Sequence, residues 1–403
     1  MQRLLRFTRH LPRHGWQPRV LCGQPPAYSS TPLDPSLLEE LSPDLSVERL
    51  RVLEPERFCN NWSRPPQKVV RNLFKTFDFA LVPDDQALWI LPAALRAVRR
   101  ARQWGADVLW ATGPPFSTLV AGYWASRWSG LPLVADFRDD WTGLGADYRR
   151  NQGWRQRREL AQERAVLSQA RLVLTVTPGL VDRLRARSPH PERVRLLPNG
   201  FEPAHFASAP TTTEPRAFFY AGSLYAQRNP AALLQAYAAF RAGWSQPGPA
   251  PELHFAGRYS DELRPLFEPC PEGVLHLGFL SHRDTCQRMS SALANVLLVD
   301  DTLPDIVYSG KLLEYFGAGR PVLALTPLDS PVAQLLAEGR LGEVAPGDDP
   351  DRLLPALQRL AQGPARAPVE AVVQRFNVEN QVVQLAEWLN EAAVQERLRL
   401  GAK

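Results

Sequence analysis

Residues 305–325 read DIVYSGKLLEYFGAGRPVLAL and carry the most information about the fold. KLLEYFGAG is predicted to be a helix, and RPVLALT (320–326) is predicted to be a strand. Ser309 and Gly310 would open the helix and leave its first N–H groups free. A turn, a helix and a buried strand in this order make up the repeating unit of a parallel α/β sheet.

The same alternation of strands and helices runs along most of the chain. A helix is expected at 2–12, a strand at 19–23 and a further helix at 92–104. Later strands are predicted at 106–112, 131–137, 171–177, 193–200, 217–223, 252–257, 274–280, 294–300 and 342–348, with helices between most of them. Residues 204–216 are rich in Pro, Thr and Ala and are predicted to be a linker. We therefore expect an α/β fold of two Rossmann-like, doubly wound parallel-sheet domains facing a cleft that holds the ligand.

Composition limits the class of protein. The 403 residues are 44% hydrophobic and 22% charged, which suits two globular domains. The net charge of +5 fits either a solvated, arginine-rich surface or attraction to phosphate on a nucleotide, an anionic lipid or a nucleic acid, and charge alone does not decide between them. Because the basic residues are dispersed and no recognition motif occurs, no nucleic-acid partner is expected. No run reaches the roughly 18 apolar residues that span a bilayer.

Metal sites and disulfides are not expected from the sequence. None of the four cysteines forms a CxxC pair, and none is judged to have a histidine at metal-ligand spacing. The absence of a disulfide framework fits a reducing cytoplasm. The only DxD, Asp349-Pro350-Asp351, resembles a helix N-cap, so a DxD-based metal-dependent transferase is not supported.

Lys311 and Glu314 are the central candidate ligand-binding residues. Lys311 lies on the first turn of the predicted helix and Glu314 one turn later, so both can face one cleft. Lysine binds phosphate as a point charge, and a carboxylate accepts hydrogen bonds from two ribose hydroxyls. The alternative is a capped helix with a Lys311–Glu314 pair on its surface.

AFFYAGSLYAQRNP (217–230) is a second candidate segment. Gly222 follows the predicted strand and would let the backbone approach a phosphate, which Arg228 could contact with its fork of donors. The alternative is an ordinary strand-to-helix turn with a surface arginine.

Polar residues also follow strands in the first half of the chain. In LVADFRDDWTG (133–143), Asp136 or Asp139 could orient an acceptor hydroxyl or act as a base, with Arg138 beside them. The alternative is a helix-capping cluster in which Arg138 pairs with an aspartate. Three further residues at strand ends are candidates to line the cleft: Gly113, Ser117 and Asn199, the last of which could simply form a turn.

Taken together, these stretches resemble the retaining GT-B glycosyltransferases of the family-4 type, the "glycosyl transferases group 1" proteins. The matching segments are ATGPPFS, LPLVADFRDDW, LLPNGFEP, FFYAGSLYAQRNP, ELHFAG, YSGKLLEYFGAGRPVLAL and the terminal helix. They occur in family order from about residue 2 to about residue 395.

The resemblance implies a division of labour between domains. Residues 1–203 would bind the acceptor, 204–216 would be the linker, 217–375 would bind a nucleoside-diphosphate sugar, and 376–403 would pack back on the first domain. Glu314 would hold the ribose, and the diphosphate would lie among Gly222, Ser223, Arg228, Ser309, Gly310 and Lys311. No cofactor or metal would be needed, because helix dipoles and cationic side chains neutralise the leaving group.

Two features depart from the family. Many relatives have Glu-x7-Glu, but the first position here is Ile306, so Asp301, Asp305 or backbone would have to contact the sugar. Relatives also begin with a strand and a Gly-rich loop before a Val-Gln-Arg-like helix start, whereas this chain opens at Met1-Gln2-Arg3. The resemblance therefore implies a gene start assigned too late, and an intact mass matching Met1 would refute this; a real Met1 would imply an inactive or unstable chain.

The expected function is a metal-independent, retaining hexosyl transfer to a glycan or lipid-linked acceptor in cell-envelope or exopolysaccharide assembly. The alternatives are a nucleotide-sugar 2-epimerase of the same fold and a non-catalytic sugar-nucleotide-binding protein. The location would be the cytoplasm, at the inner face of the plasma membrane if the basic, aromatic segment 57–79 contacts anionic lipid. The alternative for that segment is a helix covering the domain core.

Overall fold

The structure is a computed structural model that describes residues 2–24, 41–51, 81–143, 153–207, 217–299, 308, 310–363 and 367–401. The chain divides into two compact units. Unit 1 contains Asn199–Gln381 together with Met1–Phe7, and unit 2 contains Thr8–Leu33, Leu41–Pro198 and Val382–Lys403. Each unit has its own sheet and its own apolar core.

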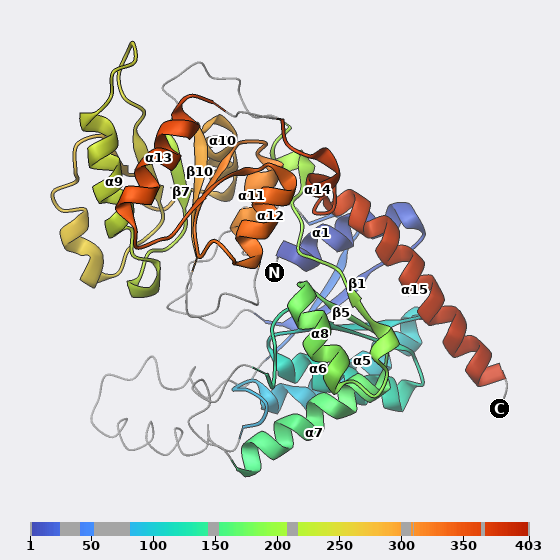
Figure 1. The fold of residues 1–403 in the computed structure, drawn as a ribbon. Coiled ribbons are helices and arrows are strands. Elements are labelled where there is room, and N and C mark those ends of the chain that lie inside the picture. The colour runs from blue at the N-terminus through green and yellow to red at the C-terminus, as the bar shows by residue number, and fades with distance from the viewer. Residues whose placement is uncertain are drawn as a thin grey trace. The chain divides into compact units, whose positions relative to one another are not determined.

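Unit 1 is built on a six-stranded parallel sheet (Figure 1). Its strands are β7 (Phe218–Ala221), β8 (Leu253–Ala256), β9 (Val274–His276), β10 (Ala294–Leu298), β11 (Val322–Leu325) and β12 (Gly342–Ala345). They lie in the order β12-β11-β10-β7-β8-β9. Chain order therefore reverses between β7 and β10, and in such sheets ligands bind beyond the carboxyl ends of the strands at this switch point.

Helices cover both faces of this sheet. They are α9 (Ala231–Ala242), α10 (His282–Ser291), α11 (Gly310–Gly317), α12 (Pro331–Gly339), α13 (Pro350–Ala361) and the short α14 (Glu370–Gln374). Phe218 and Tyr220 of β7 belong to the apolar cluster that includes α9 and α13, whereas Phe219 and Ala221 belong to the cluster that includes α11 and α12. Because successive strand residues point to opposite faces, β7 is apolar throughout and completely buried.

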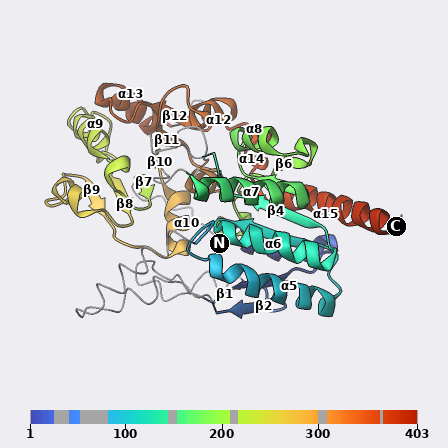
Figure 2. The same cartoon turned by 90° about the horizontal axis from the view of Figure 1, so that it is seen from below.

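Unit 2 contains a four-stranded parallel sheet in the order β3-β4-β5-β6. These strands are β3 (Leu109–Gly113), β4 (Leu133–Phe137), β5 (Ala170–Thr175) and β6 (Val194–Leu196), and β1 (Arg19–Gly23) pairs with β2 (Ser46–Leu50) in a separate two-stranded sheet. The helices are α5 (Ile90–Trp104), α6 (Phe116–Ser129), α7 (Trp154–Gln169) and α8 (Pro178–Arg187), with α5 and α6 side by side in Figure 2.

Two helices cross the boundary between the units in sequence. The N-terminal helix α1 (Gln2–His10) has its first residues in unit 1, and the long α15 (Val378–Gly401) has most of its length in unit 2. Arg195 of β6 forms an ion pair of 2.8 Å with Glu391 of α15, and its guanidinium lies 5.2 Å from the ring centroid of Trp388. The described helices include none that is long and apolar enough to cross a membrane.

The predicted α/β fold of two Rossmann-like parallel sheets is confirmed. The strand expected at 19–23 has those bounds, whereas that expected at 193–200 is only Val194–Leu196. Asp349 accepts a hydrogen bond of 3.1 Å from the Arg352 N–H and caps α13, as the N-cap interpretation of the DxD predicts.

Candidate functional site

Two glycines bring backbone and an ammonium group together at the switch point. Gly222 follows β7 with a φ of 138°, and Gly257 follows β8 with a φ of 129°. A Cβ on Gly222 would lie 1.9 Å from Lys311 Nζ, and a Cβ on Gly257 would lie 2.2 Å from the Gly222 carbonyl oxygen. Both positions therefore require glycine, because any side chain would be strained and would displace these neighbours.

Lys311 lies at the start of α11, and no carboxylate in the described part of the chain pairs with it. Its ammonium donates a hydrogen bond of 3.4 Å to the Tyr220 hydroxyl and lies 4.9 Å from the centroid of that ring. Burial, and then the positive charge of Arg228, lower the pKa of Lys311 to about 7. A depressed lysine pKa shows that the surroundings disfavour the cation, and a bound anion would reverse this.

Arg228 is the second cation of this group. Its guanidinium lies 5.0 Å from the Tyr225 ring centroid, and its buried Nε has no hydrogen-bond partner. Among the described residues, no carboxylate forms an ion pair with Arg228 or Lys311. Two neighbouring cations without a counter-ion, beside a glycine turn and the N-terminal end of α11, form a site suited to a phosphate group.

Glu314 lies one turn further along α11 and is 8% exposed. Its Oε1 accepts a hydrogen bond of 2.7 Å from Arg6 Nη2 and lies 3.3 Å from His282 Nε2. Burial would raise the pKa of Glu314, but the hydrogen bonds and charges of His282 and Arg6 outweigh it and lower the pKa. Oε2 has no hydrogen bond from the described residues, so it can accept one from a ligand hydroxyl.

The expected alternative of a Lys311–Glu314 surface pair is wrong. Lys311 contacts Tyr220, whereas Glu314 contacts Arg6 and His282, and both side chains are largely buried. The helix therefore carries two separate polar groups, a cation toward the β7 turn and a carboxylate toward α1 and α10.

Arg6 is a site residue that the sequence patterns did not reveal. Its guanidinium donates to the Gly200 carbonyl oxygen as well as to Glu314, and it is 6% exposed. Arg3, one turn earlier, donates a hydrogen bond of 3.4 Å to Asn199 Oδ1. The Asn199 carbonyl oxygen accepts from Gln381 Nε2 at 3.4 Å. Asn199 thus belongs to unit 1, in a turn held by α1.

The remaining donor-site candidates differ in placement. Gly310 begins α11 and is exposed, with no atom within 4 Å of where a Cβ would be. Ser223 is exposed, and its carbonyl oxygen accepts a hydrogen bond of 3.0 Å from Tyr220. Ser309 lies outside the described residues, as do Asp301, Asp305 and Ile306.

In unit 2, the candidate catalytic residues separate into three environments. Asp136, at the carboxyl end of β4, is fully buried and accepts a hydrogen bond of 2.8 Å from the Thr112 hydroxyl. The Arg138 guanidinium donates to the carbonyl oxygens of Gly113, at 3.3 Å, and Pro114, so it braces the turn after β3. Burial raises the pKa of Asp139, although Arg138 opposes this.

Asp140 closes the turn that follows β4, and no described helix begins at this segment. Asp140 is fully buried, accepts a hydrogen bond of 3.1 Å from the Gly143 N–H and forms ion pairs with Arg183, at 3.3 Å, and Arg187. Ser117, expected to line the cleft, is fully buried, and its N–H donates to Asp84 Oδ2 at 2.9 Å. The catalytic and cleft-lining roles of the unit 2 residues remain predictions.

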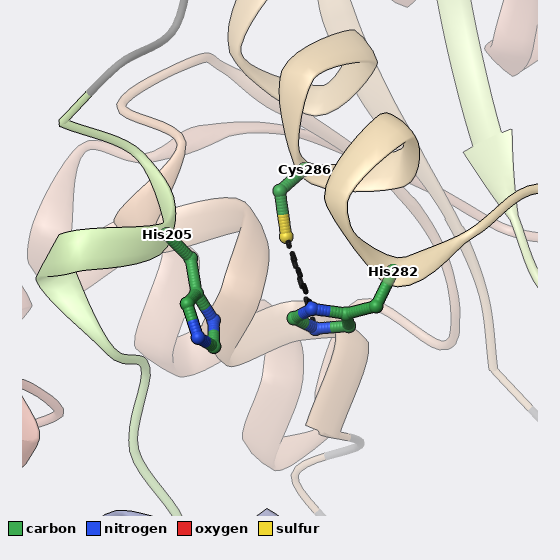
Figure 3. A group of neighbouring side chains, drawn as sticks. All are labelled: His205, His282 and Cys286. Carbon is green, nitrogen blue, oxygen red and sulfur yellow. Dashed lines mark hydrogen bonds between the residues drawn. The ribbon is translucent and has the colours of Figure 1, made fainter. Parts of the chain in front are cut away.

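One inference from the sequence needs correction. His282 and Cys286 are four residues apart on α10, which is a spacing at which one helix presents two metal ligands. His205, at the end of the 3₁₀ turn Pro203–His205, joins them, and the ligand atoms of the three side chains lie within 4.8 Å of one another (Figure 3). The inference that no cysteine has a histidine at metal-ligand spacing is therefore wrong for Cys286. His205, the third residue, is distant in sequence and could not be found from spacing.

Comparison with known proteins agrees with these observations. Residues 2–200 match the model of the glycosyl transferase 4-like domain. The Anabaena protein HepE, solved in complex with UDP, superposes with a TM-score of 0.62 at 15% identity, over 97% of this chain and 95% of that one. Among curated protein sequences, none matches the chain.

Two further solved structures are similar. The lipopolysaccharide outer core galactosyltransferase WaaB matches with a TM-score of 0.53 at 13% identity, over 94% of this chain and 99% of that one. A Listeria monocytogenes protein described as a UDP-N-acetylglucosamine 2-epimerase matches with a TM-score of 0.56 at 11% identity, over 95% and 91%. Residues 2–200 therefore form a glycosyl transferase 4-like domain, and the chain as a whole has the GT-B fold of two Rossmann-like units.

Proposed function

We propose that the protein transfers a hexosyl group from a nucleoside-diphosphate sugar to a glycan or lipid-linked acceptor, with retention and without a metal in the chemical step. The observation that carries this proposal is the pair of cations, Lys311 and Arg228, that have no counter-ion among the described residues. Lys311 lies against Gly222, and Arg228 belongs to the segment that follows Gly222 in the chain. This turn is at the β7–β10 switch point, where parallel sheets bind ligands.

The donor would use both polar groups of α11. Its diphosphate would lie against Lys311, Arg228 and the first N–H groups of the helix, and its ribose would donate a hydrogen bond to Glu314 Oε2. Cations fixed beside the diphosphate stabilise it most as negative charge develops on it during departure. The HepE complexes with UDP and with UDP-glucose support this choice of donor class.

The acceptor would bind unit 2, where Asp139 would orient or deprotonate its hydroxyl. We place the reaction in the cytoplasm, in cell-envelope or exopolysaccharide assembly. Membrane contact is supported by exposed apolar residues on two adjacent helices of unit 2: Leu91 and Leu95 of α5, Trp124 and Trp128 of α6. The segment 57–79 first considered for this role lies outside the described residues.

A panel of UDP-, GDP-, ADP- and dTDP-sugars in a thermal-shift assay tests the donor site. We expect stabilisation by one base class and its loss in Lys311→Met, with Arg157→Met, which removes an exposed cation of α7 in unit 2, as the control. No shift with any donor would refute the proposal. Release of a free epimer without acceptor would instead favour the epimerase, whose fold the Listeria protein shares. Binding without transfer or hydrolysis would favour a non-catalytic role.

A further inference from the structure

Three potential metal ligands converge beside the proposed donor site. His282 begins α10, Cys286 follows one turn later, and His205 comes from the 3₁₀ turn that precedes β7 in the chain. Cys286 is 1% exposed, and the ring centroids of His205 and His282 are 4.8 Å apart. Figure 3 shows the Cys286 sulfur directed at the His282 ring, with the His205 ring beside that ring.

The distances in this group approach those of a coordination sphere. Zinc–sulfur bonds of about 2.3 Å and zinc–nitrogen bonds of about 2.0 Å at a tetrahedral angle place sulfur and nitrogen about 3.6 Å apart. Cys286 Sγ lies 3.9 Å from His282 Nδ1 and 3.8 Å from His282 Nε2. All the ligand atoms lie within 4.8 Å of one another. Side-chain rotations that move these atoms by about an ångström would bring them to bonding distance from one ion.

The surroundings also supply the outer contact that metal-bound histidines need. His282 Nε2 lies 3.3 Å from Glu314 Oε1, and a metal bound through Nδ1 would preserve this contact. A ligating histidine commonly donates its other N–H to a carboxylate, which fixes the ring and strengthens the ligand. Arg6, on the same carboxylate oxygen, keeps Glu314 ionised and in place.

We propose that His205, His282 and Cys286 bind one Zn²⁺ ion, with a fourth position open to water. One thiolate and two imidazoles are donors that suit zinc, whereas magnesium and calcium prefer oxygen. The ion is a positioning element: it fixes His282, and through His282 the carboxylate of Glu314. This consequence for Glu314 rests on the proposed function, but the binding of the metal does not.

Spectroscopic titration with cobalt tests the site without any nucleotide. Tag-free protein stripped of metal with a chelator is titrated with Co²⁺. We expect saturation at one ion per chain, a thiolate-to-cobalt charge-transfer band, and bleaching of that band by one equivalent of Zn²⁺. Cys286→Ser should remove the band and His205→Gln should weaken cobalt binding by about tenfold or more.

Matched controls come from the same unit. Cys270 is exposed, and His254 is engaged by Glu252 at 2.8 Å, so Cys270→Ser and His254→Gln should leave the titration unchanged. If the parent shows no charge-transfer band, or if Cys286→Ser binds cobalt as the parent does, the proposal is overturned and the three side chains only pack together. A thermal melt of each variant identifies any that fails to fold, and the parent titration then decides alone.

Failure of this proposal is distinguishable from failure of the proposed function. The shift in melting temperature caused by each nucleotide sugar is measured on protein that a chelator has stripped of metal. Cobalt binding is measured without nucleotide. If metal also positions Glu314, Zn²⁺ should increase donor affinity in the parent but not in Cys286→Ser. Cobalt binding without any nucleotide shift would keep the metal site and remove the donor assignment.

Discussion

UDP binding should be accompanied by uptake of close to one proton at pH 8, and Lys311 is the reason. Because its pKa in the free protein is about 7, roughly nine-tenths of the chains hold it neutral at that pH. A phosphate charge at about 4 Å, with an effective dielectric constant of about 20, is worth about 4 kcal/mol, or about three pKa units. The bound state would then have a pKa near 10, so about 0.9 proton would be taken up on binding.

The measurement is calorimetric titration of UDP at pH 8 in buffers with different ionisation enthalpies. The slope of the observed enthalpy against buffer enthalpy gives the number of protons, and at this pH the UDP phosphates are already ionised. Lys311→Arg is the informative variant, since an arginine stays protonated and should bind UDP with almost no proton uptake. Uptake near zero in the parent, or equal uptake in Lys311→Arg, would show that Lys311 does not meet the diphosphate.

Other changes separate structural from functional roles. Glu314→Ala should destabilise the fold by about 3–5 kcal/mol in urea unfolding because it removes the carboxylate that neutralises the buried Arg6, and an unchanged free energy of unfolding would contradict this. Gly222→Ala should lose UDP binding in calorimetry and some 1–3 kcal/mol of stability, given its φ and the contact with Lys311; a variant that binds normally would exclude this turn as phosphate site. Asp139→Asn should reduce turnover by about 100-fold while UDP affinity stays unchanged, and full activity would remove Asp139 as the base.

Local features of the fold and site could be predicted from sequence because they depend on neighbouring residues. The β7 strand is an apolar run ended by a glycine, and Gly222 has the positive φ that such a turn needs. Lys311 and Glu314 were placed on one helix by their spacing alone. The partners of that helix were not predictable, since Arg6 is 308 residues away from Glu314 and lies on a helix whose pattern shows only amphipathicity.

The same distinction explains the errors. Lys311 and Glu314 are three residues apart, so local reasoning pairs them, but burial gives each a partner from another element. Likewise, Arg138 was a natural partner for a neighbouring aspartate, yet its guanidinium binds carbonyl oxygens, and Asp140 pairs with arginines of α8. Sequence proximity identifies which polar residues are close, whereas the packing of distant elements decides which of them interact.

Charge balance within unit 1 indicates which part of the donor dominates its affinity. Glu314 already has Arg6 as a counter-ion, so a ribose hydroxyl adds only a hydrogen bond to a charged oxygen, worth about 1.5–3 kcal/mol at most. Lys311 and Arg228 have no counter-ion in the described part of the chain. The lowered pKa of Lys311 reflects the free-energy cost of holding a buried cation beside another cation. A diphosphate removes that cost and gains the charge–charge attraction as well. We therefore expect the diphosphate, common to all the candidate donors, to supply most of the binding energy, and selection among bases and sugars to depend on weaker contacts.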